Sequence, residues 1–315
     1  MGRVITSATD ENGKTTNYEY SDPYNGKLTK VTYPEGNYSK FTYDDRGNLT
    51  EHRDVAKPGS GIADSVWTAG YDTTCANYVT CNQPNWVRDP NGNTSPNTSN
   101  PADETDYTYD PVHGGVLTET DPADAAGVRP QTRNTYTALY AKVLNSSGVP
   151  VNAEAPIYRL TRTSTCRTAT TANPAACVGT ANETVTTYTY NNNLLLASVT
   201  VAAGDNSITA TTSYGYDDYG NRIWVDGPRT DVDDKSYTTY DLLRRPVYEI
   251  SADPDGALSL KRTIVHHIYD VDGHEVRTET GSGNATDGSD FVMATYTAVT
   301  YDSYGNAVKT VVGQP

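Results

Sequence analysis

The sequence predicts an all-β fold, an array of antiparallel β-hairpins with almost no helix. A short pattern of tyrosine, aspartate and glycine recurs along the 315 residues, the segments between its copies alternate weakly as strands do, and no amphipathic helical segment exceeds two turns. Tyrosine numbers 25, whereas phenylalanine and methionine number 2 each. This composition cannot fill a thick sandwich core. We therefore predict a curved strip or partial hollow shell, held by cross-strand pairs and tyrosine packing.

The recurring unit is clearest in the stretch YGYDDYGNRIW. One strand runs into Tyr216, Asp217 opens the turn and Gly220 closes it. Aspartate suits the first turn position because its carboxylate accepts a backbone N–H, and glycine tolerates a positive φ. The tyrosine is expected to pack on a neighbouring hairpin with its hydroxyl hydrated. Arg244 replaces the glycine in one copy and Asn191 replaces the aspartate in another, which leaves the local turn geometry there open. The motif residues are Tyr43, Asp44, Gly47, Tyr216, Asp217, Gly220, Tyr240, Asp241, Tyr269, Asp270, Gly273, Tyr301, Asp302 and Gly305.

The spacing of the units predicts one quasi-linear array over residues 1–315. Anchoring tyrosines stand at positions 20, 43, 71, 109, 136, 190, 216, 240, 269 and 301, mostly 23–32 residues apart. Each interval holds two strands and two connections, so each unit is expected to pack mainly on its neighbours. Residues 1–131 carry the first repeats, 132–190 form an irregular insertion, and 191–315 carry regular repeats.

The four cysteines form two local pairs. Cys75 and Cys81 are six residues apart, and Cys166 and Cys177 are eleven apart, so neither pair has the two-residue gap typical of zinc sites. Both pairs lie in polar, threonine-rich loops, which predicts disulfides that close long hairpin tips; four free thiols are the alternative. Disulfides would place the mature chain outside the cytoplasm.

Charge and motifs exclude several functional classes. A formal net charge of −15 argues against nucleic acid and anionic membrane surfaces as partners. No apolar run approaches 18 residues, so no membrane span is predicted. The sequence contains no HExxH, GxSxG, P-loop or dinucleotide-binding motif. We therefore predict no catalytic residue, no cofactor-binding residue and no cofactor.

Acidic turns and histidines offer weak candidates for metal binding. Residues 270–273 and 253–256 have the DxDG pattern of calcium loops, but they lack a third acidic ligand and the closing glutamate. His266 and His267 are adjacent on a predicted strand, so their rings point to opposite faces. Hairpin turns explain the acidic pattern better, and no metal site is predicted.

The copies YDDRGNL, YDDYGNR, YDVDGHE and YDSYGNA resemble the YD repeats of bacterial Rhs (rearrangement hot spot) proteins, wall-associated proteins and teneurins. The resemblance covers nearly the whole chain. It implies a long hairpin strip that winds into a hollow shell, which in Rhs toxins encloses a cytotoxic C-terminal domain. Such shells end in a self-cleaving segment with a DPxGxxxW-like motif. Residues 89–92 and 253–256 match only its first four positions, so no catalytic residue is carried over.

The expected function is that of a non-enzymatic structural segment of a secreted or surface-exposed bacterial Rhs/YD-repeat protein. Its expected partners are the remainder of the parent shell and an enclosed or presented C-terminal toxin or effector domain. One alternative is an adhesion module that binds carbohydrate or a cell-surface protein through its tyrosines, although their repeat spacing favours packing. Another is a segment of an extracellular YD-repeat fibre. Unpaired edge strands are expected near residues 1–20 and 295–312.

Overall fold

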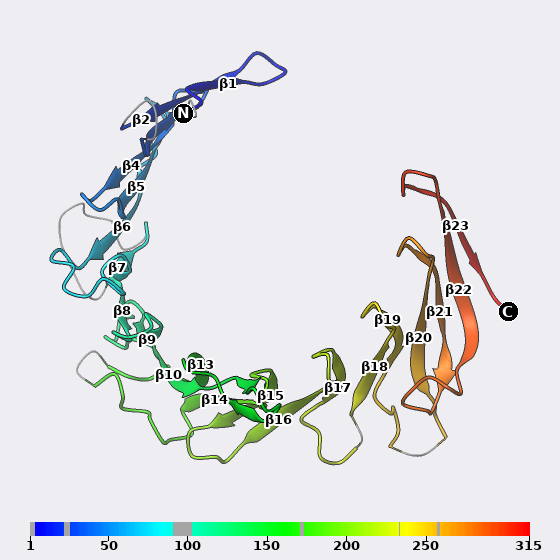
Figure 1. The fold of residues 1–315 in the computed structure, drawn as a ribbon. Helices are drawn as coiled ribbons and strands as arrows, with labels where there is room; N and C mark the ends of the chain where they lie inside the picture. The colour runs from blue at the N-terminus through cyan, green and yellow to red at the C-terminus, as the bar shows by residue number, and fades with distance from the viewer. Residues whose placement is uncertain (1–3, 22–25, 91–102, 171–172, 233, 257–258) are drawn as a thin grey trace. The chain divides into compact units, whose positions relative to one another are not determined.

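The computed structural model describes residues 4–21, 26–90, 103–170, 173–232, 234–256 and 259–315. These residues contain twenty-three strands and no α-helix (Figure 1), which confirms the predicted all-β class and hairpin array. No helix in the described part of the chain could therefore cross a membrane. The chain divides into two compact units, residues 1–136 with 162–184, and residues 137–161 with 185–315.

The strands of the N-terminal part are β1 (Ser7–Thr9), β2 (Thr15–Tyr20), β3 (Leu28–Thr32), β4 (Tyr38–Tyr43), β5 (Leu49–Val55), β6 (Ser65–Tyr71), β7 (Pro84–Arg88), β8 (Thr105–Tyr109), β9 (Val116–Thr120) and β10 (Gln131–Leu139). The middle of the chain forms β11 (Lys142–Leu144), β12 (Pro150–Asn152), β13 (Ile157–Cys166), β14 (Glu183–Tyr190), β15 (Leu196–Ala203) and β16 (Thr209–Tyr216). The C-terminal part forms β17 (Arg222–Asp226), β18 (Ser236–Tyr240), β19 (Pro246–Ile250), β20 (Arg262–Tyr269), β21 (Glu275–Gly283), β22 (Val292–Tyr301) and β23 (Ala307–Gly313).

The strands follow one another as an antiparallel meander. In the first unit each strand from β1 to β9 pairs with the next one, ending with β9 on β10. In the second unit the same holds from β15 to β23, whose strands lie side by side in chain order in Figure 1. Strands β11 and β12 form a separate ladder. Short local connections thus account for the pairing from β1 to β10 and from β15 to β23.

The YD turns are five-residue reversals with a bulge at the glycine. The Gly220 N–H donates to the Asp217 carbonyl and the Asp217 N–H donates to the Asn221 carbonyl, both at 3.0 Å, while Gly220 adopts φ +83°. The Asp217 carboxylate accepts the backbone N–H groups of Tyr219 at 3.0 Å and Asn221 at 2.8 Å. This is the turn that the Asp and Gly positions predict. Residues 44–48, 270–274 and 302–306 repeat both backbone bonds.

The copy with arginine in place of glycine keeps the same turn. Arg244 adopts φ +65°, and its N–H still donates to the Asp241 carbonyl at 2.9 Å. Its guanidinium reaches the preceding turn, where it donates to the Asn221 side chain at 2.8 Å and to the Tyr219 carbonyl at 2.6 Å. These bonds offset the strain of a left-handed conformation at a residue with a Cβ. Asn191 replaces aspartate without change, because its side-chain oxygen accepts the same turn N–H groups.

The apolar core is thin. In the second unit, Ile250 of β19 and Ile264 of β20 face each other in the ladder and are among the few fully buried apolar side chains. In the first unit, Cys166, Ala169 and Cys177 form a small buried cluster. Cross-strand pairs therefore carry much of the stabilisation, as the scarcity of phenylalanine and methionine predicts.

Gly220→Val is expected to lower the free energy of unfolding by more than about 1 kcal/mol, because a β-branched residue is strained at positive φ. Ser303→Val, at an exposed position of an equivalent turn, should change it little. Urea denaturation of both variants measures the difference. Equal losses would contradict the turn geometry.

Candidate functional site

The motif tyrosines connect each hairpin to the one before it. The Tyr216 hydroxyl donates to the carbonyl of Leu196 at 2.9 Å, and Leu196 is the first residue of the returning strand of the preceding hairpin. The expectation of a hydrated hydroxyl was wrong, because the preceding hairpin supplies a backbone acceptor. The same bond joins Tyr43 to Leu28, Tyr71 to Leu49, Tyr109 to Pro84, Tyr240 to Arg222 and Tyr301 to Glu275, at 2.7 to 3.1 Å.

We call these contacts tyrosine rungs, meaning a tyrosine hydroxyl bonded to the first carbonyl of the previous hairpin's returning strand. Burial raises the pKa of Tyr43 and Tyr71, and it raises that of Tyr109 to about 12, with smaller contributions from neighbouring groups. The hydroxyls of Tyr43, Tyr71 and Tyr109 therefore stay protonated as donors at ordinary pH. Each rung contributes about 1 kcal/mol by the usual net value of a hydrogen bond. Tyr269 makes a different contact, with the Arg245 guanidinium 4.3 Å from its ring centroid.

The turn aspartates act as acceptors for backbone N–H groups. Hydrogen bonding to the Arg245 N–H lowers the pKa of Asp241, and bonding to the Asn306 N–H lowers that of Asp302. Burial alone would raise the pKa of Asp44 and Asp217, but hydrogen bonds from the asparagine four residues on bring it below the usual value. The carboxylates are thus held ionised by the turns that they build.

Acid is expected to destabilise the fold through these turns. A pKa that is lower in the folded state than in the unfolded state gives stability that is present above the unfolded value of about 3.9 and lost as pH falls through the folded value. We expect the thermal midpoint to drop between about pH 5 and pH 2. Replacing Asp44, Asp217, Asp241 and Asp302 together by asparagine should flatten that drop. An unchanged pH profile in this variant would contradict the role of the carboxylates.

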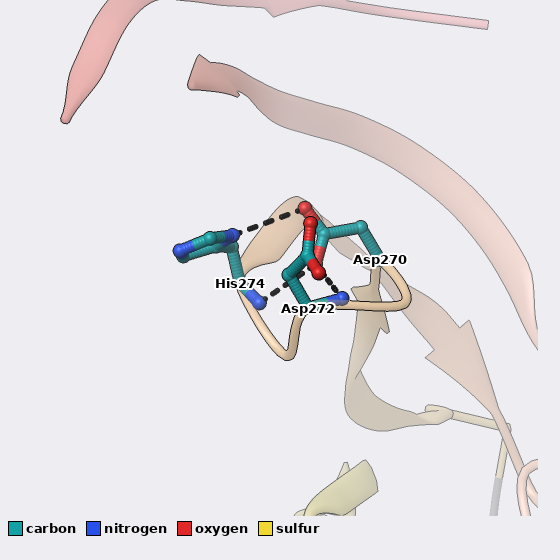
Figure 2. Close-up of side chains that lie close together, drawn as sticks. All are labelled: Asp270, Asp272 and His274. Atoms are coloured by element: carbon teal, nitrogen blue, oxygen red, sulfur yellow. Dashed lines mark hydrogen bonds and ion pairs between the residues drawn. The ribbon is translucent and has the colours of Figure 1, made fainter. Parts of the chain in front are cut away.

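The turn at residues 270–274 brings together two aspartates and a histidine (Figure 2). The possible ligand atoms of Asp270, Asp272 and His274 lie within 4.8 Å of one another. The His274 Nδ1 lies 3.2 Å from Asp270 Oδ2, and the His274 and Asp272 backbone N–H groups both donate to Asp270 Oδ1. The imidazole also stacks on Tyr301, with ring centroids 4.7 Å apart.

The equivalent position in other turns explains this histidine. Asparagine occupies it in three copies, and its amide donates to the second carboxylate oxygen of the turn aspartate, as Asn221 does to Asp217 at 2.8 Å. Asn48 and Asn306 make the same bond. His274 therefore fills the place of a turn-forming amide, and hairpin geometry accounts for the cluster. The absence of a metal site stays a prediction.

The adjacent histidines of β20 each have their own carboxylate. His266 Nδ1 lies 2.9 Å from Glu279, and its ring stacks on Tyr248 at 4.4 Å. His267 Nδ1 lies 2.8 Å from Glu275. Because neighbouring residues of a strand point to opposite faces, the two rings do not converge, as predicted.

A groove lies between two hairpins of the second unit. The β17–β18 ladder that joins these hairpins consists of Trp224 with Tyr237 and Val225 with Ser236, while side-chain bonds from Tyr240 and Arg244 join the hairpins nearer their turns. This groove has a volume of about 600 Å³. No pattern in the sequence predicts this groove. Its lining includes Tyr219, Trp224, Tyr237, Tyr240, Leu242 and Arg244.

Both predicted disulfides are present, Cys75 with Cys81 and Cys166 with Cys177. The second bridge is buried, with Cys166 at 0% and Cys177 at 3% exposure. Of the two partial DPxGxxxW matches, the first includes residues 91 and 92, outside the described residues. In the second, residues 253–256, the Asp253 carboxylate accepts turn N–H groups from Asp255 and Gly256, which is a structural arrangement.

Buried ionic groups in the first unit were missed by sequence reasoning. Arg88 and Glu104 form an ion pair whose side chains are 7% and 8% exposed. Glu183 accepts hydrogen bonds from Arg162, Ser164 and the Gly179 N–H beside the second disulfide. These residues belong to no repeat motif, so no pattern in the sequence indicates that they are buried or which residues they contact. Their contacts lie at the end of β7 and at the start of β14.

Comparison with protein families identifies one segment of the chain: the RHS Repeat family matches residues 22–57. No curated protein matches the sequence. Among solved structures, the crystal structure of TcdB2-TccC3-TEV is 13% identical and aligns over 97% of this chain and 16% of that chain, with a TM-score of 0.33. A Photorhabdus luminescens Tc holotoxin pore with a TccC3 mutation is 13% identical over 96% of this chain and 18% of that chain, with a TM-score of 0.24. A porin-like protein from Bacteroides uniformis is 12% identical over 95% and 96% of the two chains, with a TM-score of 0.26.

The chain spans about a sixth of the length of the TcdB2-TccC3-TEV chain that it matches. At these identities and TM-scores, no functional argument rests on the solved structures. The assignment rests on residues 22–57, which include the β4–β5 hairpin and its turn YDDRGNL. Residues 22–57 of this chain therefore match an RHS Repeat.

Proposed function

We propose that this chain is a non-enzymatic structural segment of a bacterial RHS/YD-repeat shell, part of a wall that encloses or presents a C-terminal toxin or effector. The tyrosine rungs carry this proposal. They recur from hairpin to hairpin at the same position, and each ties two successive hairpins without using a common core. A wall needs this kind of bond, since it must hold its shape while both faces meet water or cargo.

Several further observations support a wall. The motif aspartates and glycines are occupied in building turns, and the histidines of β20 are paired with separate carboxylates. The remainder of the parent shell would continue the hairpin array beyond β1 and β23. Two disulfides favour a secreted or cell-surface location, because such bonds persist in oxidising compartments. No cofactor, hydrolase activity or transferase activity is expected.

Protease protection of the parent protein tests this proposal. The segment that follows the RHS array in the parent chain should resist a non-specific protease while the array is folded. It should become digestible when several rungs are removed together by Tyr216→Phe, Tyr240→Phe and Tyr301→Phe. A matched control replaces the exposed Tyr78 by phenylalanine, which should keep protection. Digestion of the following segment in the unaltered protein would contradict enclosure.

A second candidate function is carbohydrate binding, favoured by the groove between β17 and β18. Aromatic rings beside hydroxyl, amide and guanidinium groups suit the faces and hydroxyls of a sugar. A glycan array separates this candidate from the wall. Binding that is lost in Tyr219→Ala and Leu242→Ala, two exposed residues of the lining, would support it. If no glycan on the array binds, the structural wall remains as the proposed function.

A further inference from the structure

The loop that joins β6 to β7 is closed at its base by the Cys75–Cys81 disulfide. Within it, the Asp72 carboxylate accepts hydrogen bonds from the Thr74 N–H at 2.9 Å and the Ala76 N–H at 3.0 Å. The Cys81 N–H donates to the Asn77 carbonyl at 2.9 Å. The bridge thus joins two positions within the loop, whose ends are held by the Tyr71–Pro84 pair of the β6–β7 ladder.

The preceding YD turn bonds to both ends of this loop through Arg46. Its guanidinium donates to the carbonyls of Asp72 and Thr73 at the start of the loop and to the carbonyl of Cys81 at its end. The Arg46 Nε also donates to the Asn82 side chain at 3.3 Å. The Cys75–Cys81 bridge and the Tyr71–Pro84 pair of the β6–β7 ladder together hold these acceptors, nine residues apart, within reach of one guanidinium.

The following turn bonds to the same loop from the other side. The Asn77 side chain donates to the Pro111 carbonyl at 2.8 Å, and the Gln83 side chain donates to the Gly114 carbonyl at 2.9 Å. Pro111 and Gly114 belong to the turn between β8 and β9. The disulfide loop therefore joins three successive turns of the first unit, at residues 44–48, 72–83 and 110–115.

We propose that the Cys75–Cys81 loop is a redox-sensitive clasp that locks three neighbouring hairpin turns together while it is oxidised and releases them on reduction. The inference rests on the proposed wall function, in which the clasp would loosen the wall on entry into a thiol-rich, reducing compartment. A dithiol acts as the reductant of the Cys75–Cys81 disulfide. Its thiolate attacks the Cys75 sulfur and Cys81 leaves as a thiolate; the second thiol of the reagent then displaces Cys75. Two electrons and two protons pass to the cysteines, and the reagent becomes a cyclic disulfide.

The two bridges differ in access to such a reagent. In the clasp, Cys75 is half-buried and Cys81 is buried, whereas Cys166 and Cys177 both lie in the buried cluster of the first unit, so only the clasp has a partly accessible sulfur. Thiol–disulfide exchange requires approach to a sulfur atom, so the clasp should be reduced first. The buried bridge would keep the irregular segment folded while the turns are released.

Stepwise reduction of the intact chain with dithiothreitol tests this inference. Alkylation and peptide mapping should show Cys75 and Cys81 modified while Cys166 and Cys177 remain joined. Amide hydrogen exchange should then become about tenfold faster in turns 44–48 and 110–115. The turn at 217–221, which lies in the other unit, is the control and should keep its rate.

Two variants make the test independent of the reagent. Cys75→Ser with Cys81→Ser should reproduce the faster exchange in both turns without dithiothreitol. Arg46→Gln should accelerate exchange at 44–48 while leaving 110–115 unchanged, because only the first turn depends on that guanidinium. Unchanged exchange after cleavage of the bridge, earlier reduction of Cys166–Cys177, or equal acceleration at 217–221 would each overturn the clasp. Hydrogen exchange is measured on this chain, whereas protease protection is measured on the parent protein. The clasp proposal and the wall proposal can therefore be refuted independently of each other.

Discussion

Gly215→Val is expected to lower the free energy of unfolding by about 3 kcal/mol. Gly215 lies opposite Trp224 in the β16–β17 ladder, and the indole lies over the glycine. A Cβ at Gly215 would come within 1.9 Å of the indole nitrogen, so the ring would have to move. The Lys235 ammonium lies 4.3 Å from the centroid of the same ring, and this contact would be disturbed with it. Urea denaturation followed by tryptophan fluorescence measures the loss.

The control for this substitution is a double-mutant cycle with Trp224→Ala. Once the indole is removed, Gly215→Val should cost much less, because the clash is gone. An undiminished loss in the Trp224→Ala background would contradict the contact. Gly70 and Trp86 form the same cross-strand pair in the β6–β7 ladder, where a Cβ would lie 2.2 Å from the indole nitrogen. Gly70→Val should therefore behave in the same way.

Glu104→Ala is expected to lower the free energy of unfolding by about 3–5 kcal/mol, because it removes one half of a buried ion pair with Arg88. Glu35→Ala is the matched control, since its pair with Lys14 is exposed, at 54% and 59%. The control should unfold close to the unaltered protein. Chemical denaturation of both variants gives the comparison. Similar losses at the two sites would show that burial of the Arg88–Glu104 pair does not determine its contribution.

The hairpins could be predicted from the sequence because their chemistry is local. Asp217 and Gly220 specify their turn through bonds that span four residues, and alternation specifies the flanking strands. The rungs could not be predicted in the same way. The acceptor of Tyr216 is a backbone carbonyl twenty residues earlier, and any residue can supply that group. The position of Leu196 at the start of a returning strand is visible only once the hairpins are stacked.

The groove and the buried ion pair also depend on long-range geometry. The groove exists because the β17–β18 ladder contains only two residue pairs. The length of that ladder cannot be predicted from the sequence. Arg88 ends β7 and Glu104 precedes β8, and no periodic pattern in the sequence predicts that these two charges are buried together. Arg244 shows the same limit, because its left-handed turn is held by side-chain bonds to the preceding hairpin.

A cryo-EM map of the full-length parent protein tests the wall most directly. In this chain the returning strand after the last YD turn begins at Ala307, the position whose carbonyl accepts a rung in the preceding hairpins. The account predicts a further hairpin paired along β23, with a tyrosine hydroxyl bonded to the Ala307 carbonyl and separate density enclosed by the wall. The account would be contradicted if helices capped β1 and β23 around a closed pocket with converging histidine and aspartate side chains.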